Sequence, residues 1–154
     1  MNEVNASRNT REFIAFMVRG QEFCIDITSI REIRGWNHAT RLPHVPQYVV
    51  GVINLRGTIL PIVDVALRFG MGSGEPNKHS VIIVSQIEGR LVGMLVESVS
   101  DILQVEEAEI RNLPDVNSSM AREFLRQVVV HEGRIICEIA LEKMVPQVEL
   151  EAAA

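Results

Sequence analysis

The sequence has few of the residues that most often bind metals or form covalent links. Among its 154 residues there are only 2 cysteines and 4 histidines. Cys24 and Cys137 each lie within an apolar run, so we interpret both as small buried hydrophobic residues rather than as a disulfide pair. The histidines share no metal-ligand spacing. We therefore expect no disulfide, no metal site and no cofactor.

Motifs of the common enzyme classes are also absent. The chain contains no H-E-x-x-H, C-x-x-C or G-x-S-x-G pattern and no Walker loop. The G-x-G pattern in residues 70–74 joins a predicted helical turn to a linker, which is the wrong context for a phosphate loop. One alternative stays open, a small ligand-binding or hydrolytic barrel with Asp64 and His44 in a pocket. Apart from this alternative, the sequence favours a binding module that is not an enzyme.

Long apolar runs and a strongly basic charge are missing as well. No run reaches the roughly 18 apolar residues of a transmembrane helix, and residues 1–10 lack the apolar region of a signal peptide. The net charge of −5 argues against nucleic acid or an anionic membrane as the main partner. These features predict a cytoplasmic protein with no nucleic-acid partner and no direct membrane insertion.

Lysine is scarce, because only 2 of the 15 basic residues are lysines. Arginine makes planar, bidentate contacts and is enriched in protein interfaces. The bias is compatible with a binding surface, although genomic base composition explains it equally well.

The apolar residues that are present form short strands, and one hairpin organises them. Val49–Leu55 and Thr58–Val63 are rich in β-branched residues. Arg56–Gly57 between them is typical of a tight turn, because glycine adopts positive φ without a steric penalty. Pro61 lacks a backbone donor and predicts an edge or an irregularity in the second strand. Asp64 is placed to cap a short helical turn.

The same order of elements occurs twice along the chain. We expect strands at residues 13–18, 22–27, 30–34 and 39–43 before the hairpin, and at 80–87, 91–96, 99–105, 127–131 and 134–139 after it. A polar connector is expected over residues 106–114, and short helices over 120–124 and 140–145. Shifts of 69 and 76 residues superpose the two halves, with the matches Gly20 on Gly89, Glu32 on Asp101, Ile33 on Ile102, Gly57 on Gly133 and Ile59 on Ile135. The ordered reuse of turn glycines favours duplication over chance.

This repeat predicts a mainly β fold of two small, packed barrels, each with about five strands, and a few short helices. We expect one domain over residues 11–146, with a first barrel at about 11–70 and a second at about 79–146. Exchange of strands between the barrels is left open. Residues 1–10 and 147–154 are expected to be flexible tails. A groove between two such lobes is a natural binding site.

Three residues stand out as candidates for binding. Arg56 lies at a turn apex, where its guanidinium is either solvated or able to reach a partner or an internal carboxylate. Glu32, between apolar residues, is either that carboxylate or an ordinary strand residue. Trp36 is either an interface anchor or a plug for the first barrel.

Three segments resemble the CheW family of bacterial chemotaxis coupling proteins. They are GQEFCIDITSIREIRGW, RLPHVPQYVVGVINLRGTILPIVDVALRFG and GRLVGMLVESVSDILQVEEAEIR. The likeness covers roughly residues 11–146. Its most specific part is VPxxxxGVINLRGxxxPIVD.

The resemblance implies two SH3-like five-stranded barrels that form a non-enzymatic scaffold. Such proteins couple the cytoplasmic tip of methyl-accepting chemotaxis receptors to the regulatory domain of a CheA-type histidine kinase. They thereby support kinase control and the assembly of receptor arrays at the inner membrane. A paralogous adaptor for another receptor–kinase pathway is the alternative.

The resemblance also implies partner-binding residues. Asn54, Leu55, Arg56 and Gly57 match the family's NLRG turn, and Glu32 matches an acidic residue that is a candidate ion-pair partner of Arg56. The remaining candidates are apolar groove residues and kinase-facing residues of the second lobe, namely Val49, Val50, Val52, the Gly89 hairpin and Val99.

Overall fold

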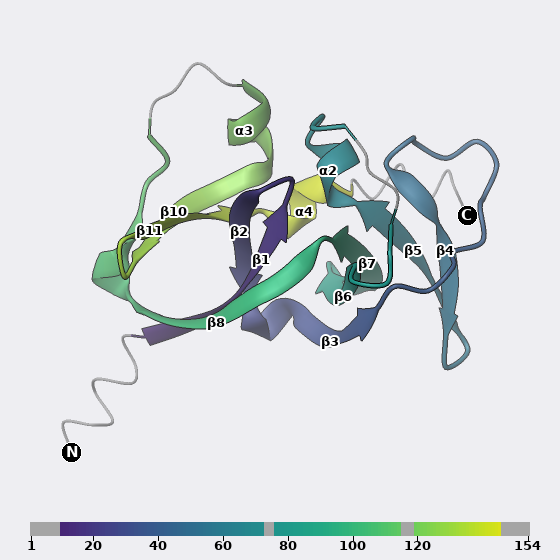
Figure 1. The fold of residues 1–154 in the computed structure, drawn as a ribbon, viewed down its shortest axis with the longest axis horizontal. Coiled ribbons are helices and arrows are strands. Elements are labelled where there is room, and N and C mark those ends of the chain that lie inside the picture. The colour runs from purple at the N-terminus through teal and green to yellow at the C-terminus, as the bar shows by residue number, and fades with distance from the viewer. Residues whose placement is uncertain (1–9, 73–75, 115–118, 146–154) are drawn as a thin grey trace.

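Strands from both halves of the chain combine into two sheets (Figure 1). The computed structural model describes residues 10–72, 76–114 and 119–145. The strands are β1 (Thr10–Val18), β2 (Gln21–Asp26), β3 (Ile30–Gly35), β4 (Val49–Leu55), β5 (Thr58–Asp64), β6 (Val81–Ile87), β7 (Arg90–Val96), β8 (Ser98–Glu106), β9 (Ile110–Arg111), β10 (Leu125–His131) and β11 (Arg134–Ile139). The short helices are η1 (Ile27–Ser29), α2 (Val65–Arg68), η2 (Glu107–Glu109), α3 (Ser119–Phe124) and α4 (Leu141–Met144). The predicted mainly β fold with a few short helices is confirmed.

Neither sheet is built from one contiguous half of the chain. The six-stranded sheet has the order β8-β1-β2-β11-β10-β9, and the five-stranded sheet has the order β3-β6-β7-β5-β4. The β1–β2 hairpin therefore pairs with β8 and β11 of the second half. The β6–β7 hairpin pairs in the same way with β3 and β5 of the first half. Each half contributes its first hairpin to the sheet that the other half completes.

Four hairpins use the same two-residue turn. The turns are Arg19–Gly20, Arg56–Gly57, Glu88–Gly89 and Glu132–Gly133, and both residues of each have positive φ. Two consecutive residues with positive φ form a type I′ turn, whose twist matches that of the flanking strands. The predicted hairpin turns are confirmed, and their recurrence follows the internal repeat.

Two predicted segments differ from the structure. Residues 39–43 form no strand, because only Thr40 makes a β-bridge, with backbone hydrogen bonds of 2.8 Å in both directions to Val52. The expected polar connector at 106–114 contains η2 and the two-residue strand β9. That strand is the sixth of its sheet, and short strands of this kind give too little apolar pattern to be predicted.

Pro61 shows how the β4–β5 hairpin tolerates a proline. Val52, its partner in β4, directs its N–H and C=O groups to Thr40 on the other side. The Val52–Pro61 pair is thus a non-hydrogen-bonded one, so the missing donor does not interrupt the ladder. On the far side of β5, pairing with β7 begins only at Ile62.

The largest apolar cluster lies where the two sheets meet. It includes residues of both sheets and of α2, α3 and α4, and the side chains of Phe16, Ile83, Met94 and Met144 are almost fully buried in it. Two smaller apolar clusters form the local cores of the barrels, one from residues of the six-stranded sheet and one from residues of the five-stranded sheet. Trp36 packs, half-buried, against the cluster of the five-stranded sheet, as a barrel plug does. The molecule is therefore held together by one shared core and two local ones.

Candidate functional site

The turn between β4 and β5 carries the predicted ion pair. Arg56 Nη2 lies 2.6 Å from Glu32 Oε1, although the Arg56 side chain is 72% exposed. Glu32 belongs to β3 and Arg56 follows β4, and these strands are the two edges of the five-stranded sheet. The ion pair thus links the two edges and helps to close the sheet into a barrel.

A second arginine holds the other oxygen of the same carboxylate. Arg34 Nη1 donates to Glu32 Oε2 at 3.0 Å. Hydrogen bonds from Arg56 and then from Arg34 hold the pKa of Glu32 below its ordinary value. With two guanidinium groups around one carboxylate, this surface has a net positive charge.

The NLRG residues have different positions around this turn. Asn54 Oδ1 accepts a hydrogen bond of 2.8 Å from the backbone N–H of Gly57, which stabilises the turn that presents Arg56. Leu55 is buried in the interior of the five-stranded sheet. Only Arg56 and Asn54 therefore present side-chain polar groups to solvent.

The three predicted groove valines also differ in exposure. Val49 is buried in the shared core, whereas Val50 and Val52 are half-buried. Val52 lines a surface cavity of about 390 Å³ together with Arg34, Asn54 and Ile59. Ile59 is 60% exposed and is the most exposed large apolar side chain of this sheet. We call Glu32, Arg34, Arg56 and Ile59 the Arg56 surface.

The six-stranded sheet has a comparable cluster that sequence reasoning missed. Arg134 of β11 donates to Glu22 of β2 through Nη2 and lies 3.3 Å from Asp101 of β8 through Nη1. Ser100 Oγ donates to Glu22 at 2.8 Å. The hydrogen bonds from Arg134 and Ser100 hold the pKa of Glu22 below its ordinary value. We call Glu22, Ser100, Asp101 and Arg134 the Arg134 surface.

The repeat relates the surroundings of the two clusters. Glu32 and Asp101 occupy matching positions, and each is followed by an exposed isoleucine, Ile33 or Ile102. The β5 and β11 strands expose a further matching pair, Ile59 and Ile135, the latter 71% exposed. The match of Glu32 with Asp101 was the one signal in the sequence for the Arg134 surface, since Arg134 itself matches Thr58 in the repeat.

The candidates of the second lobe do not share one sheet. Val99 lies in β8 of the six-stranded sheet and packs, half-buried, against the shared core. The Gly89 turn joins β6 and β7 of the five-stranded sheet. Val99 matches Ile30 in the repeat, and Ile30 packs against the same core.

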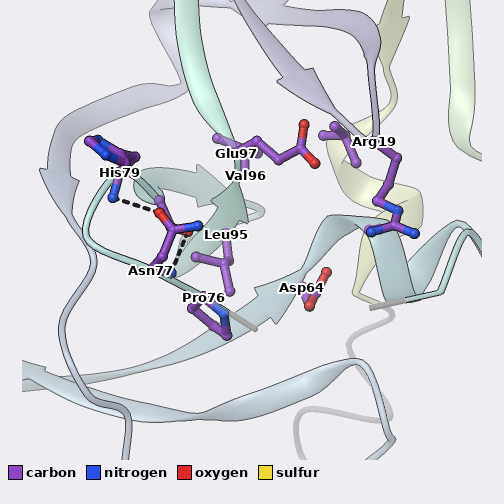
Figure 2. Close-up of a pocket in the computed structure, with 11 residues that line it drawn as sticks. Arg19, Asp64, Pro76, Asn77, His79, Leu95, Val96 and Glu97 are labelled. Carbon is purple, nitrogen blue, oxygen red and sulfur yellow. Dashed lines mark hydrogen bonds between the residues drawn. The ribbon is translucent and has the colours of Figure 1, made fainter. Parts of the chain in front are cut away.

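The alternative pocket with Asp64 and His44 is not formed. Asp64 lines a cavity of about 340 Å³, and Figure 2 shows Arg19 and Glu97 at the same cavity. His44 is not among the residues that line it and is exposed on the loop before β4. Asp64 Oδ1 accepts a hydrogen bond of 3.1 Å from Leu67 N–H, so this carboxylate caps α2 as predicted. Burial raises the pKa of Asp64, and the backbone hydrogen bonds from Leu67 and Ala66 that accompany its capping role oppose this shift.

Comparison with known proteins identifies the family. The model of the CheW-like domain matches residues 12–149. The chain belongs to the CheW family. It is 53% identical over 143 residues to "Chemotaxis protein CheW" of Rhizobium meliloti (strain 1021), with 93% of this chain and 92% of the relative covered. It is 48% identical over 147 residues to "Probable chemotaxis protein CheW" of Rhizobium etli, covering 96% of this chain and 95% of that one.

A solved structure agrees with this assignment. The scaffolding protein TtCheW from Thermoanaerobacter tengcongensis superposes with a TM-score of 0.83 at 27% identity, covering 88% of this chain and 92% of that chain. The family consists of non-catalytic adaptors, and the chain is a coupling protein of chemotaxis. Among the described residues, no helix is both long and apolar enough to cross a membrane.

Proposed function

We propose that this chain couples the cytoplasmic tip of methyl-accepting chemotaxis receptors to the regulatory domain of a CheA-type histidine kinase. It does so without enzymatic activity, in the cytoplasm, recruited to receptor arrays at the inner membrane. The proposal rests on membership of the CheW family and on two surfaces that suit protein partners.

The Arg56–Glu32 pair carries the proposal. Arg56 is 72% exposed, and its position is fixed by the carboxylate of Glu32 and by a turn that Asn54 stabilises. An exposed guanidinium of fixed orientation loses little conformational entropy when it binds a carboxylate of a partner. Ile59 adds an apolar contact beside this charge. Such a combination of arginine and apolar residues is typical of protein interfaces.

The Arg134 surface gives the scaffold its second contact. It lies on the other sheet and its core contains two acids and one arginine, so its charge is opposite to that of the Arg56 surface. A protein with one contact on each sheet can bind two partners at once. Reversible signalling is compatible with micromolar single contacts, about −8 kcal/mol each, which gain strength when several act together. Val50, Val52, Asn54 and Val99 remain proposed contributors near these surfaces.

The alternative function is also that of an adaptor, and it differs from the proposed one only in the receptor and kinase that the chain binds. A paralogous adaptor would use the same surfaces for another receptor–kinase pair. Binding to the regulatory domain of a CheA kinase separates the two, because a paralogue of that kind would not bind it.

The experiment that tests the proposal is a calorimetric titration of the purified chain against an isolated CheA regulatory domain. We expect saturable micromolar binding that R56E weakens at least tenfold. The matched control is R126E, since Arg126 is also an exposed, ion-paired arginine but pairs with Glu142 away from the Arg56 surface. No binding by the unchanged chain would contradict the proposed function, whereas equal binding by R56E would contradict a kinase contact through the Arg56 surface. Thermal unfolding of each variant shows whether the fold is retained.

A further inference from the structure

Arg68, the last residue of α2, makes contacts across the junction of the two halves. Its Nε donates to the carbonyl oxygen of Met144 at 2.6 Å, and its Nη2 lies 3.4 Å from that of Lys143. Both acceptors belong to α4. The guanidinium carbon lies 4.3 Å from the ring centre of Tyr48 and 4.7 Å from that of Phe124. One side chain therefore contacts α2's own half through Tyr48 and the other half through α3 and α4.

Within the described part of the chain, this arginine contacts carbonyl oxygens and aromatic rings and no carboxylate. Among the ion pairs between described residues, none includes Arg68. Burial lowers its pKa below the ordinary value for arginine, with an opposing effect from Glu123. Helix-terminal carbonyls and aromatic faces both favour a cation. Because a planar guanidinium can stack and donate at the same time, lysine cannot reproduce this set of contacts.

The contacts of Arg68 join the ends of the two sheets. α2 directly follows β5 of the five-stranded sheet, and α4 follows β11 of the six-stranded sheet. In Figure 1 the two helices lie together where the sheets meet. The neighbouring Phe69 extends the contact, with its ring centre 5.1 Å from that of Phe23 and 5.5 Å from that of Phe124. The rest of the junction combines apolar packing, which has no preferred direction, with a backbone hydrogen bond of 3.0 Å from the N–H of Glu97, after β7, to the carbonyl oxygen of Met17 in β1.

We propose that Arg68 is a positioning residue that fixes the orientation of one sheet relative to the other. It thereby fixes the angle between the Arg56 surface and the Arg134 surface. The effect of Arg68 on orientation follows from its contacts alone. Its consequence for partners rests on the proposed function, because a scaffold with two contacts depends on the geometry that separates them.

The first test measures the orientation directly. Spin labels are attached to cysteines introduced at two exposed strand positions, Thr58 of β5 and Gln104 of β8, one on each sheet. The background carries C137S, since Cys137 is half-buried whereas Cys24 is buried. Pulsed dipolar spectroscopy then gives the distribution of distances between the sheets. We expect R68Q to widen this distribution at least twofold, and R68K to widen it by a smaller amount.

A matched control separates orientation from the attachment of α4. Arg126 also binds α4, through Nη2 to both carboxylate oxygens of Glu142, but it comes from β10 of the same half. R126Q removes this contact and should leave the distance distribution unchanged. An R68Q distribution as narrow as that of the parent would overturn the proposal, as would equal widening by R126Q. If R68Q does not fold, R68K carries the same test.

The second test measures the consequence for partners. Binding of R68Q to the kinase regulatory domain alone and to a receptor-tip fragment alone should stay within twofold of the parent. Formation of the complex of all three proteins should fall at least fivefold. A parallel loss in both single-partner titrations would show that Arg68 acts only through general stability and would overturn its positioning role. Should the parent chain bind neither partner, the proposed function fails, while the distances between the labels still decide the role of Arg68.

Discussion

At the residue scale, the Glu32 carboxylate is held by two arginines that reach it from different parts of the sheet. Arg56 comes from the turn after β4, and Arg34 is two residues further along β3. Exposed ion pairs of this kind contribute little to stability. Their main effect is therefore to orient Arg56, and this is why we expect R56E to change binding while leaving the fold intact.

The six-stranded sheet contains a buried carboxylate, Glu138, whose pKa is shifted in the opposite direction from that of Glu32. Glu138 is only 2% exposed, and its Oε1 accepts a hydrogen bond of 2.7 Å from Gln127. Burial raises the pKa of Glu138 above its ordinary value, although the amide of Gln127 and the charge of Arg11 act against this shift. A raised carboxyl pKa means that the folded state favours the protonated acid more than the unfolded state does. The ionised group therefore reduces stability near neutral pH.

The direction of this pKa shift predicts how the stability of E138Q depends on pH. Between the unfolded pKa, about 4.3, and the higher folded pKa, the folded chain binds more protons than the unfolded chain, so stability falls as pH rises. Glutamine keeps the size and a hydrogen-bond acceptor but does not titrate. We expect the melting temperature of E138Q to exceed that of the parent at pH 7.5, with the difference vanishing near pH 4. Thermal melts of both proteins across this range measure it, and a difference independent of pH would contradict the assignment.

At the element scale, β4 depends on a glycine that lets the segment around Thr40 approach closely. Gly51 has a φ of +155°, and a Cβ atom there would lie 2.5 Å from the carbonyl oxygen of Thr40. The register of the β4–β5 pair shifts between Val49 and Gly51. This irregularity allows the Thr40–Val52 bridge to cover the edge of the sheet.

G51A should therefore lower stability by about 1–3 kcal/mol, the cost of a forced steric overlap. The matched control is G35A in β3, where a Cβ atom meets nothing within 4 Å. That variant should stay within about 0.5 kcal/mol of the parent. Urea unfolding measures the free energy of unfolding of both variants. If G51A is as stable as G35A, the Thr40 segment can move away from the added Cβ atom, which contradicts the prediction.

Most of the individual elements could be predicted from the sequence, but their pairing into sheets could not. Strands, two-residue turns and the Asp64 cap were predictable, since alternating apolar residues, Gly in turns and Asp before a helix are local signals. The exchange of hairpins between the sheets was not predictable, because β2 and β11 pair in parallel across more than 100 residues. Local patterns carry no information about such partners.

The candidate site was predictable to a similar degree. The Arg56–Glu32 pair followed from the family motif, and its presence is confirmed. Val49 lies on the opposite face of β4 from Val50 and Val52, so the alternation along the strand already indicated that it is buried with Ile53 and Leu55. The Arg134 surface joins β2, β8 and β11, three strands that only the tertiary fold brings together.

At the scale of the whole molecule, the proposed function assigns one partner contact to each of the two barrels. The shared core fixes the barrels against each other, and Arg68 adds a directional link at the same junction. Coupling then follows from geometry, since each partner is positioned relative to the other through the protein between them. No step in this account requires chemistry by the scaffold itself.

The most direct test of this account is a reconstitution of kinase control. A CheA-type kinase and a receptor-tip fragment are mixed with increasing amounts of this chain, and kinase autophosphorylation is measured. A parallel assay with the coupling protein native to that kinase establishes that both partners are active. The account predicts at least tenfold stimulation that needs all three proteins and that R56E largely abolishes. Active partners whose autophosphorylation does not respond to this chain at any concentration would contradict it.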